Sequence, residues 1–266
     1  MPTPLPRLVA FDLDDTLAPS KSPMAASMGQ ALVTLLGRAP VCVISGGRME
    51  QFVDQVLRRP ELTAAPEPLL ERLHLMPTCG TRYYRRQAGQ WLLQYAHDLT
   101  PEERAEAARV TQEEARRLGL WEEDTWGPAI EDRGSQVTYS ALGQEAPLEA
   151  KRAWDPTGGK KAALRDAVAA RLPELEVRSG GSTSVDITRH GVDKAYGMSR
   201  LAEQTGVELG DMLFIGDRLD EGGNDYPVKE LGVPCVAVDG WERTVDVVTD
   251  LCARYDEDHA GGAGRR

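Results

Sequence analysis

Four uninterrupted apolar runs place the strongest constraint on the fold, because each of them ends abruptly in polar residues. The runs are residues 7–11, 41–44, 212–215 and 234–238. Continuous rather than alternating hydrophobicity is typical of strands buried on both faces, as in a parallel sheet covered by helices. Helical patterns lie between the runs, at about residues 25–36, 49–57, 194–205 and 244–254. The sequence therefore predicts an α/β fold with a doubly wound, Rossmann-like parallel sheet.

The middle of the chain has a different pattern. Residues 81–95 alternate on both sides of a turn, as a β-hairpin does. Further strands are expected at residues 136–140, 174–178 and 184–188, and helices at residues 100–118 and 160–172. Strands that alternate around two helices predict a separate α+β unit, the cap, over residues 81–190. This cap would be inserted into a core domain formed by residues 1–80 and 191–255.

Composition and charge limit the classes of partner. The 266 residues carry a net charge of −11, which argues against a nucleic-acid surface. No apolar run approaches the roughly 20 residues needed to cross a bilayer, so no membrane partner is expected. The N-terminus lacks the pattern of a secretory signal, and the four cysteines are scattered, which together favour the cytoplasm. Residues 256–266, rich in glycine and charge, predict a disordered tail.

Asp12 and Asp14 directly follow the first apolar run and are two residues apart, so they point the same way in an extended chain. Phosphoryl transfer needs an in-line nucleophile, a metal that neutralises phosphate charge and a proton donor for the leaving oxygen. Asp12 meets the first two needs, as nucleophile and metal ligand, and Asp14 meets the third. The alternative is that both acids cap the following helix. This pair alone leaves the two interpretations nearly balanced.

Polar residues at the other strand ends favour the catalytic interpretation. Ser45 and Gly46 offer a hydroxyl and an unhindered amide that can cradle a phosphate. Lys194, at the start of a helix that returns to the core, can bridge nucleophile and phosphate. Asp217, Asn224 and Asp225 follow the third run, and oxygen ligands of this kind suit Mg²⁺. Each signal alone is weak, but all of them fall at strand ends, where ligands bind in open α/β sheets.

The four motifs, in this order, resemble those of the haloacid dehalogenase superfamily. They are Asp-x-Asp-x-Thr from Asp12, Ser-Gly-Gly from Ser45, Lys194, and Gly-Asp-x₄-Gly-Gly-Asn-Asp from Gly216. A large cap between the second and third motifs resembles the IIB-type branch, which includes eukaryotic-type phosphomannomutases and sugar-phosphate phosphatases. The likeness covers about residues 7–250. The phosphomannomutase-like signatures include residues 180–186, 193–196 and 216–226.

The resemblance implies a role for each matching residue. Asp12 would be phosphorylated, and Asp14 would be the general acid/base and lend its backbone carbonyl to the metal. Lys194 would hold the phosphoryl group together with Ser45. The implied Mg²⁺ ligands are Asp12, Asp14, Asp217, Asn224 and Asp225. The implied phosphate- and substrate-binding residues are Ser45, Gly46, Lys21, Arg133, Ser184 and Asp186. The mutase relatives pair through the cap, so the resemblance also allows a homodimer.

Three positions depart from the mutase pattern. Gln144, Lys151 and Lys21 stand where the mutases show arginines. Arginine clamps a phosphate bidentately, whereas lysine is a point charge and glutamine carries no charge. A mutase must hold either phosphorylated end of a hexose in its cap, so these changes weaken the mutase reading and leave hydrolysis untouched. Arg152 and Arg178 are the candidates that could compensate.

Three hypotheses follow. The first is a magnesium-dependent phosphatase of a sugar phosphate or a similar small metabolite. The second is a phosphohexomutase that returns the phosphoryl group of Asp12 to the sugar. The third is a non-catalytic binding protein that kept the fold, and the intact set of Asp12, Asp14, Lys194 and Asp217 argues against it. The feature that separates the first two is positive charge in the cap, especially around Gln144.

Overall fold

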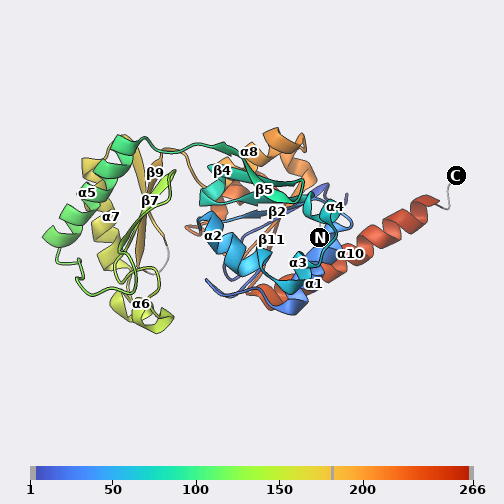
Figure 1. The fold of residues 1–266 in the computed structure, drawn as a ribbon, viewed down its shortest axis with the longest axis horizontal. Coiled ribbons are helices and arrows are strands. Elements are labelled where there is room, and N and C mark those ends of the chain that lie inside the picture. The colour runs from blue at the N-terminus through green and yellow to red at the C-terminus, as the bar shows by residue number, and fades with distance from the viewer. Residues whose placement is uncertain (1–3, 181–182, 264–266) are drawn as a thin grey trace. The chain divides into compact units, whose positions relative to one another are not determined.

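The computed structural model describes residues 4–180 and 183–263, and the chain forms two compact units (Figure 1). Unit 1 comprises the chain up to Ala96 and from Asp193 onward, and unit 2 comprises residues His97–Val192. Each unit has a sheet of its own and its own hydrophobic core.

The seven-stranded sheet of unit 1 is mostly parallel. In spatial order its strands are β11 (Cys235–Ala237), β10 (Met212–Gly216), β1 (Leu8–Phe11), β2 (Val41–Ile44), β3 (Leu73–Met76), β4 (Arg82–Gln87) and β5 (Gln90–Ala96). The pairs from β11 to β3 are parallel, whereas β4 and β5 form an antiparallel hairpin at one edge. Three of the four apolar runs form the adjacent central strands β10, β1 and β2. The predicted α/β class is therefore confirmed.

Helices cover both faces of this sheet. The helices and helical turns of unit 1 are α1 (Ala26–Leu36), α2 (Met49–Phe52), the π-helical turn η1 (Val53–Leu57), α3 (Pro60–Thr63), α4 (Glu67–Leu70), η2 (Thr78–Gly80), α8 (Lys194–Thr205), η3 (Leu209–Asp211), α9 (Tyr226–Glu230) and α10 (Trp241–Ala263). Val9 and Phe11 pack with α1 and α10 on one face. Leu8 and Ala10 pack with α8 and α9 on the other. A strand buried on both faces needs no polar alternation, which explains the continuous run.

Unit 2 has a four-stranded antiparallel sheet with helices on one face (Figure 1). Its strands, in spatial order, are β6 (Ile130–Asp132), β7 (Gln136–Ser140), β9 (Ser184–Arg189) and β8 (Leu175–Ser179), and its helices are α5 (Pro101–Arg117), α6 (Leu148–Trp154) and α7 (Gly159–Arg171). Val137 and Ile187 pack against α5 and α7. Thr138 and Asp186 pair across the strands on the opposite, polar face. One face of this sheet is therefore apolar core, and the other presents hydrogen-bonding groups.

The predicted boundaries of the cap differ from those of unit 2. The hairpin of β4 and β5 extends the unit 1 sheet, because β4 pairs with β3 through Leu75 and Tyr84. Strand β3 was not predicted, so the sequence offered no partner for the hairpin in the core. The chain divides at 96/97 and 192/193, rather than at the expected 80/81 and 190/191.

The prediction of a disordered tail from Asp256 is wrong for most of that segment, because α10 continues to Ala263. The helix is fastened where the tail was expected to begin. The hydroxyl of Tyr255 donates to the carbonyl of Pro6, and the guanidinium of Arg38 donates to both oxygens of Asp256 over 2.9 and 2.7 Å. These contacts hold the helix against unit 1, and its last turns extend from that anchor. The end of the predicted tail, residues 264–266, lies outside the described residues.

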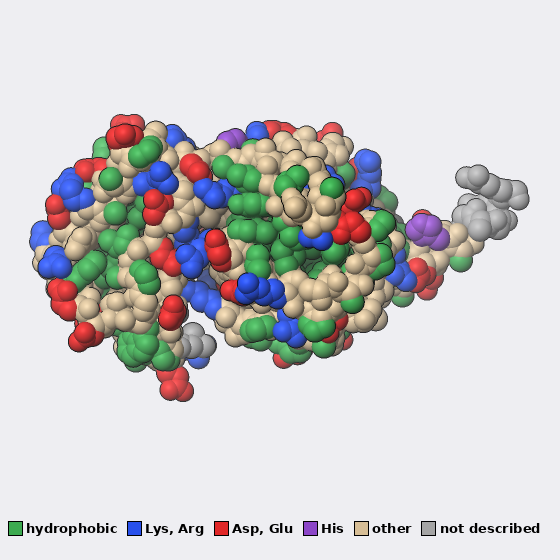
Figure 2. Space-filling view, viewed as in Figure 1, with side chains coloured by type: hydrophobic (Ala, Val, Ile, Leu, Met, Phe, Trp, Pro, Cys, Tyr) green, Lys and Arg blue, Asp and Glu red, His purple; other side chains and the backbone are tan. Residues whose placement is uncertain are grey.

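The surface carries charges of both signs. Figure 2 shows acidic and basic side chains interspersed over the visible face of unit 2. Exposed ion pairs, such as Arg109 with Glu113 at 2.6 Å, contribute to this mixture but little to stability. Within the described part of the chain, no helix has the length and hydropathy to cross a membrane.

Candidate active site

Asp12 follows strand β1 at the carboxyl edge of the unit 1 sheet. The preceding residue, Phe11, is level with Val43 of β2 and Ile215 of β10 in the parallel register. The amide of Asp12 donates to the carbonyl of Ile215 over 3.0 Å, so its backbone still belongs to the ladder. The residue is only 3% exposed. The sheet thus presents a buried carboxylate at the edge where ligands of α/β proteins bind.

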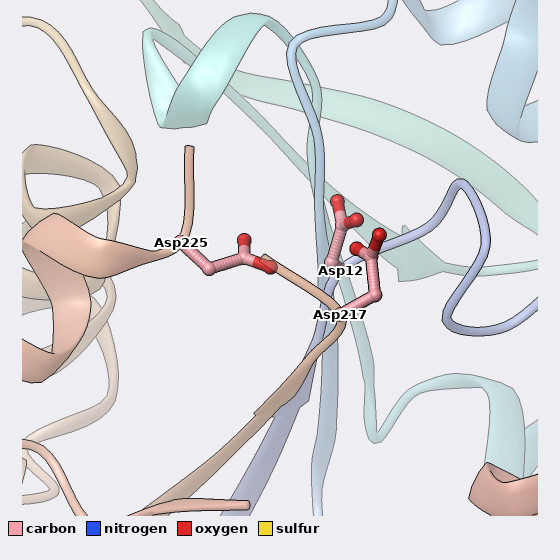
Figure 3. Close-up of side chains that lie close together, drawn as sticks. All are labelled: Asp12, Asp217 and Asp225. Carbon is pink, nitrogen blue, oxygen red and sulfur yellow. The ribbon is translucent and has the colours of Figure 1, made fainter. Parts of the chain in front are cut away.

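Two further carboxylates come from the segment that follows β10. Carboxylate oxygens of Asp12, Asp217 and Asp225 all lie within 4.8 Å of one another, and Figure 3 shows the three side chains converging. Asp225 is fully buried, whereas Asp217 is half-buried and accepts from the hydroxyl of Thr16 over 3.4 Å. The amide of Arg218 donates to Oδ2 of Asp225 over 3.1 Å, which closes the loop on itself.

Two glycines allow this loop to fold back. A Cβ on Gly216 would lie 2.3 Å from Oδ2 of Asp225, so the carboxylate occupies the space of the missing side chain. A Cβ on Gly223 would lie 2.1 Å from the carbonyl oxygen of Arg218. Both distances are far below contact distance, so any larger residue would push Asp225 away from Asp12.

Lys194 supplies the positive charge at the centre of the site. Its ammonium group donates to Oδ1 of Asp12 over 2.6 Å and to Oδ1 of Asp225 over 2.5 Å, and the residue is 1% exposed. Lys194 is the first residue of α8, whose N-cap Asp193 accepts from the amide of Tyr196 over 3.0 Å. The cap fixes where the helix begins and therefore where the lysine leaves the backbone.

A close contact between two glycines sets the position of α8. A Cβ on Gly80 would lie 2.5 Å from the Cα of Gly197, and a Cβ on Gly197 would lie 2.3 Å from Cδ1 of Ile44. The hydroxyl of Tyr95 donates to the carbonyl of Gly80 over 2.8 Å, which holds the turn η2 in place. Because Gly197 lies one helical turn after Lys194, this packing brings the lysine to the carboxyl ends of the strands.

Burial dominates the electrostatics of the site. It raises the pKa of Asp12 to about 8, against the opposing effect of Lys194, and the nearby Asp225 adds to the rise. Burial also raises the pKa of Asp217. For Lys194, burial acts to lower the pKa, but the carboxylates of Asp12 and Asp225 outweigh it and the pKa is raised. The lysine is therefore charged. Its single positive charge cannot balance the negative charge of three ionised carboxylates.

The donor set fits a divalent cation. Three carboxylates against one ammonium leave an excess of negative charge, which costs free energy in a buried site. All the donors are hard oxygens, the ligands that Mg²⁺ prefers, and a half-buried Asp217 leaves room for the waters that this ion retains. Asn224, an expected ligand, lies beside Asp225 and is exposed.

The Ser45-Gly46-Gly47 turn lies on the strand next to β1. Ser45 stands two residues beyond Val43 and is 4% exposed, and Gly46 is half-buried. The amide of Gly47 donates to Oγ of Ser45 over 3.2 Å, which orients the hydroxyl. The structure thus brings Ser45 and Gly46 to the same edge of the sheet as Asp12.

Asp14 contacts two residues that the sequence did not single out. Its Oδ2 accepts from Nε2 of Gln51 over 2.8 Å, and its Oδ1 accepts from Nε2 of Gln55 over 3.1 Å. The amide of Lys21 also donates to Oδ1 over 2.7 Å. The cluster of acidic groups within 4.8 Å found among the described residues does not include Asp14. The available signal was the i,i+4 spacing of the two glutamines, which puts both on one helix face.

Lys21 contacts Asp14 through its backbone amide, and its side chain is exposed. Its φ of 53° lies in the left-handed region, which turns the chain back toward the carboxylate. This contact to Asp14 therefore comes from the backbone of Lys21 and would be available to any residue at that position.

The expected substrate residues of the cap lie in unit 2. Oδ1 of Asp186 accepts from Nε2 of Gln136 over 2.8 Å and from Oγ1 of Thr138 over 2.7 Å. The hydroxyl groups of Ser140 and Ser184 are 3.0 Å apart. These five residues, three on β7 and two on β9, lie on one polar face of the sheet.

Two other positions in unit 2 are engaged locally. The guanidinium of Arg133 pairs with Oε2 of Glu131 over 2.8 Å. The ammonium of Lys151 donates to the backbone carbonyl of Gln144 over 2.8 Å, so two of the departures from the mutase pattern contact each other. Gly181 and Ser182, part of the motif at residues 180–186, lie outside the described residues.

The sequence of this chain is similar to one protein family and to a phosphomannomutase. Residues 153–238 match the family model of the haloacid dehalogenase-like hydrolases. A phosphomannomutase of Encephalitozoon cuniculi is 25% identical over 238 residues, which cover 82% of each chain.

Solved structures share the fold at low identity. The IMP-bound, N-terminally truncated IMP-nucleotidase of Plasmodium falciparum has a TM-score of 0.67 at 11% identity, covering 94% of this chain and 68% of that one. A haloacid dehalogenase-like hydrolase of Bacteroides thetaiotaomicron has a TM-score of 0.62 at 16% identity, covering 92% of this chain and 99% of that one. Nearly the whole chain is therefore built on one shared fold.

Proposed function

We propose that the chain is a haloacid dehalogenase-like hydrolase and, more narrowly, a magnesium-dependent phosphatase of a sugar phosphate or a similar small phosphorylated metabolite. The observation that carries the proposal is the buried ammonium of Lys194 between the carboxylates of Asp12 and Asp225. A protein that only binds a ligand needs no nucleophile. A carboxylate held at a strand end by a lysine suits attack on phosphorus.

In the first proposed step Asp12 takes the phosphoryl group. Lys194 donates to Oδ1 of Asp12, so Oδ2 is the oxygen that attacks. A bond forms between Oδ2 and phosphorus while the bond from phosphorus to the leaving oxygen breaks. Asp14 gives its proton to that oxygen. The hydroxyl of Ser45 and the amide of Gly46 hold the phosphoryl oxygens during the transfer.

In the second step water removes the phosphoryl group. Asp14, now a carboxylate, takes a proton from the water as its oxygen bonds to phosphorus. The bond between phosphorus and Asp12 breaks, which releases inorganic phosphate and restores the free carboxylate. Asp14 is then protonated and ready for the next turnover.

Mg²⁺ would be held by the carboxylates of Asp12, Asp217 and Asp225, with the backbone carbonyl of Asp14 and the side chain of Asn224 as further candidates. It would neutralise charge on the phosphoryl oxygens and on the buried carboxylates. The excess of carboxylates over ammonium groups supports this assignment.

The substrate class is proposed from unit 2. Its polar face carries paired hydroxyl groups at Ser140 and Ser184 and a carboxylate at Asp186, groups that recognise the hydroxyls of a sugar. Arg133 is the proposed contact for a second anionic group, and its partner Glu131 would have to release it. A cytoplasmic location suits the buried thiols of Cys42 and Cys252. The proposal also includes a homodimer formed through unit 2.

A phosphohexomutase is the second candidate, favoured by the similarity to a phosphomannomutase over 82% of the chain. In that case the phosphoryl group on Asp12 returns to the sugar instead of passing to water. Lys151 donates to the carbonyl of Gln144, so a position where the mutases carry an arginine is occupied by a lysine that serves a local contact. This observation favours hydrolysis.

One assay separates the candidates. Purified protein with Mg²⁺ is given a panel of hexose phosphates, and free phosphate and isomerised sugar are measured separately. The proposal expects phosphate release that is abolished in Asp12→Asn, with no isomerisation even when hexose bisphosphate is added. Isomerisation without net phosphate release would establish the mutase instead. Neither activity on any substrate would contradict both.

A further inference from the structure

We infer that Gln51 is a positioning residue for the proton transfer, and that it ties the orientation of Asp14 to the Ser45-Gly46-Gly47 turn. This inference rests on the proposed function, because it assigns a task within that reaction. Gln51 lies in α2, seven residues from the end of strand β2. Its side chain lies against both Asp14, which follows strand β1, and Gly47, which follows strand β2.

Three donors fix the carboxylate of Asp14. Gln51 is the donor on Oδ2, at 2.8 Å, while the amide of Lys21 and Nε2 of Gln55 both donate to Oδ1. A carboxylate held from both sides has a fixed plane, so its direction toward a leaving oxygen is set before substrate arrives. A general acid works only within hydrogen-bond reach of that oxygen, so its orientation limits the rate.

The side chains of Gln51 and Gln55 differ in the hydrogen bonds that they make. Gln55 is 2% exposed, and its Nε2 also donates to the carbonyls of Ser22 at 3.0 Å and Pro19 at 3.4 Å. The backbone carbonyl of Gln55 accepts from the backbone amide of Met24 over 2.9 Å. Gln55 therefore holds the loop after Asp14 together. The side-chain amide of Gln51, by contrast, donates to Oδ2 of Asp14.

Gln51 also lies against the phosphate-binding turn. A Cβ on Gly47 would lie 2.1 Å from Oε1 of Gln51 and 2.7 Å from its Cδ, so the glutamine amide fills the space that a side chain at Gly47 would need. The amide of Gly47 in turn donates to Oγ of Ser45. One planar amide thus touches the turn that would hold the phosphoryl group and the residue that would protonate the leaving oxygen.

The dependence on leaving group tests this role. An alkyl oxygen, as in a hexose 6-phosphate, needs a proton to depart, whereas the aryl oxygen of p-nitrophenyl phosphate leaves readily without one. Gln51→Met removes the donor at similar length. The comparison is made on the single-turnover transfer to Asp12, because the later attack by water uses Asp14 whatever the leaving group. We expect this transfer from the alkyl phosphate to slow about 10- to 100-fold, with KM and the transfer from the aryl phosphate little changed. Gln51→Lys, which keeps a donor, should recover most of the loss.

The matched control is Gln30→Met, the same replacement at an exposed position of α1. It should leave both rates and the thermal unfolding temperature unchanged, and thermal unfolding of Gln51→Met checks that the variant is folded. Equal losses on both substrates, no loss on the alkyl phosphate, or no recovery in Gln51→Lys would overturn the positioning role while the phosphatase stands. Wild-type protein that hydrolyses neither substrate with Mg²⁺ would overturn the proposed function, and this role with it.

Discussion

The ammonium group of Lys194 lies 2.6 Å from Oδ1 of Asp12, although 182 positions separate the two residues in the chain. Both are buried, and the same ammonium contacts Asp225. The contact joins the first strand of unit 1 to the helix that begins directly after unit 2. The contact therefore forms only when the two chain segments of unit 1, before and after unit 2, fold together.

Replacing this lysine should affect stability as well as activity. In Lys194→Met the carboxylates of Asp12 and Asp225 lose their buried partner, and breaking such a pair typically costs about 3–5 kcal/mol. Denaturant unfolding in EDTA should show that loss, and Mg²⁺ should restore part of it. The exposed Lys229 gives the control, since Lys229→Met should change little. An unchanged stability in Lys194→Met would contradict the buried pairing.

Metal removal should destabilise the protein. If Mg²⁺ binds the three carboxylates only in the folded state, Mg²⁺ at 100 times its dissociation constant adds about 2.7 kcal/mol to the free energy of unfolding. Titration calorimetry and unfolding with and without Mg²⁺ measure both quantities. Asp217→Asn should weaken binding and reduce the stabilisation. Asp220→Asn, in the same loop but paired with Arg218 in solvent, should retain both. Equal effects in the two variants would argue against the proposed ligand set.

His74 should make stability depend on pH below neutrality. Burial, with a smaller effect of Arg85, lowers its pKa from 6.5 to about 3, and Nδ1 lies 2.6 Å from the hydroxyl of Tyr83. The stability that comes from burying the neutral ring is fully present above pH 6.5. Between pH 6.5 and about 3 the unfolded chain binds a proton that the folded ring does not, so the free energy of unfolding falls as pH is lowered.

The matched variant for this slope is His74→Gln, which keeps a neutral hydrogen-bonding group. Denaturant unfolding at several pH values should show a smaller loss per pH unit in the variant, by at most about 1.4 kcal/mol. His190→Gln is the control, because the pKa of the exposed His190 is raised by the carbonyl of Pro173 and by Glu176, the opposite direction. A slope in His74→Gln identical to that of the wild type would show that the ring is not buried neutral.

The glycine contact beneath α8 should be sensitive to a single methyl group. In Gly197→Ala the new Cβ would meet Cδ1 of Ile44 at 2.3 Å and the carbonyl of Cys79 at 2.7 Å, so α8 must shift and take Lys194 with it. Misplacement of about 1 Å can cost about 100-fold in rate. Steady-state assays should therefore show a large fall in kcat. Gly210→Ala, where nothing lies near the added Cβ, should show none.

Much of the fold and the site could be predicted because it follows from local patterns at strand ends. A continuous apolar run identifies a doubly buried strand, and the carboxyl ends of parallel strands share one edge. Asp12, Asp217 and Asp225 consequently appear in the sequence as separate polar ends, and the structure brings them within 4.8 Å. Lys194 follows the same logic from the start of its helix.

The parts that could not be predicted depend on long-range pairing or on ordinary residues. An alternating hairpin such as β4 and β5 does not say which sheet it joins, and the missed β3 was its partner. Gln51 and Gln55 carry no signature beyond their i,i+4 spacing, which many polar pairs on helices share, because their importance comes from the acceptor on Asp14. The anchor of α10 at Tyr255 and Arg38 likewise arises only when distant segments meet.

The central claim is a covalent phosphoryl group on Asp12, and trapping it is the most direct test. The protein is mixed with Mg²⁺ and a hydrolysed substrate, quenched in acid and reduced with borohydride, which converts an aspartyl phosphate to homoserine. Peptide mass spectrometry then locates the changed residue. We predict homoserine at position 12 only when substrate and Mg²⁺ are both present. Phosphate release with an unmodified Asp12, or with the modification at another aspartate, would contradict the account.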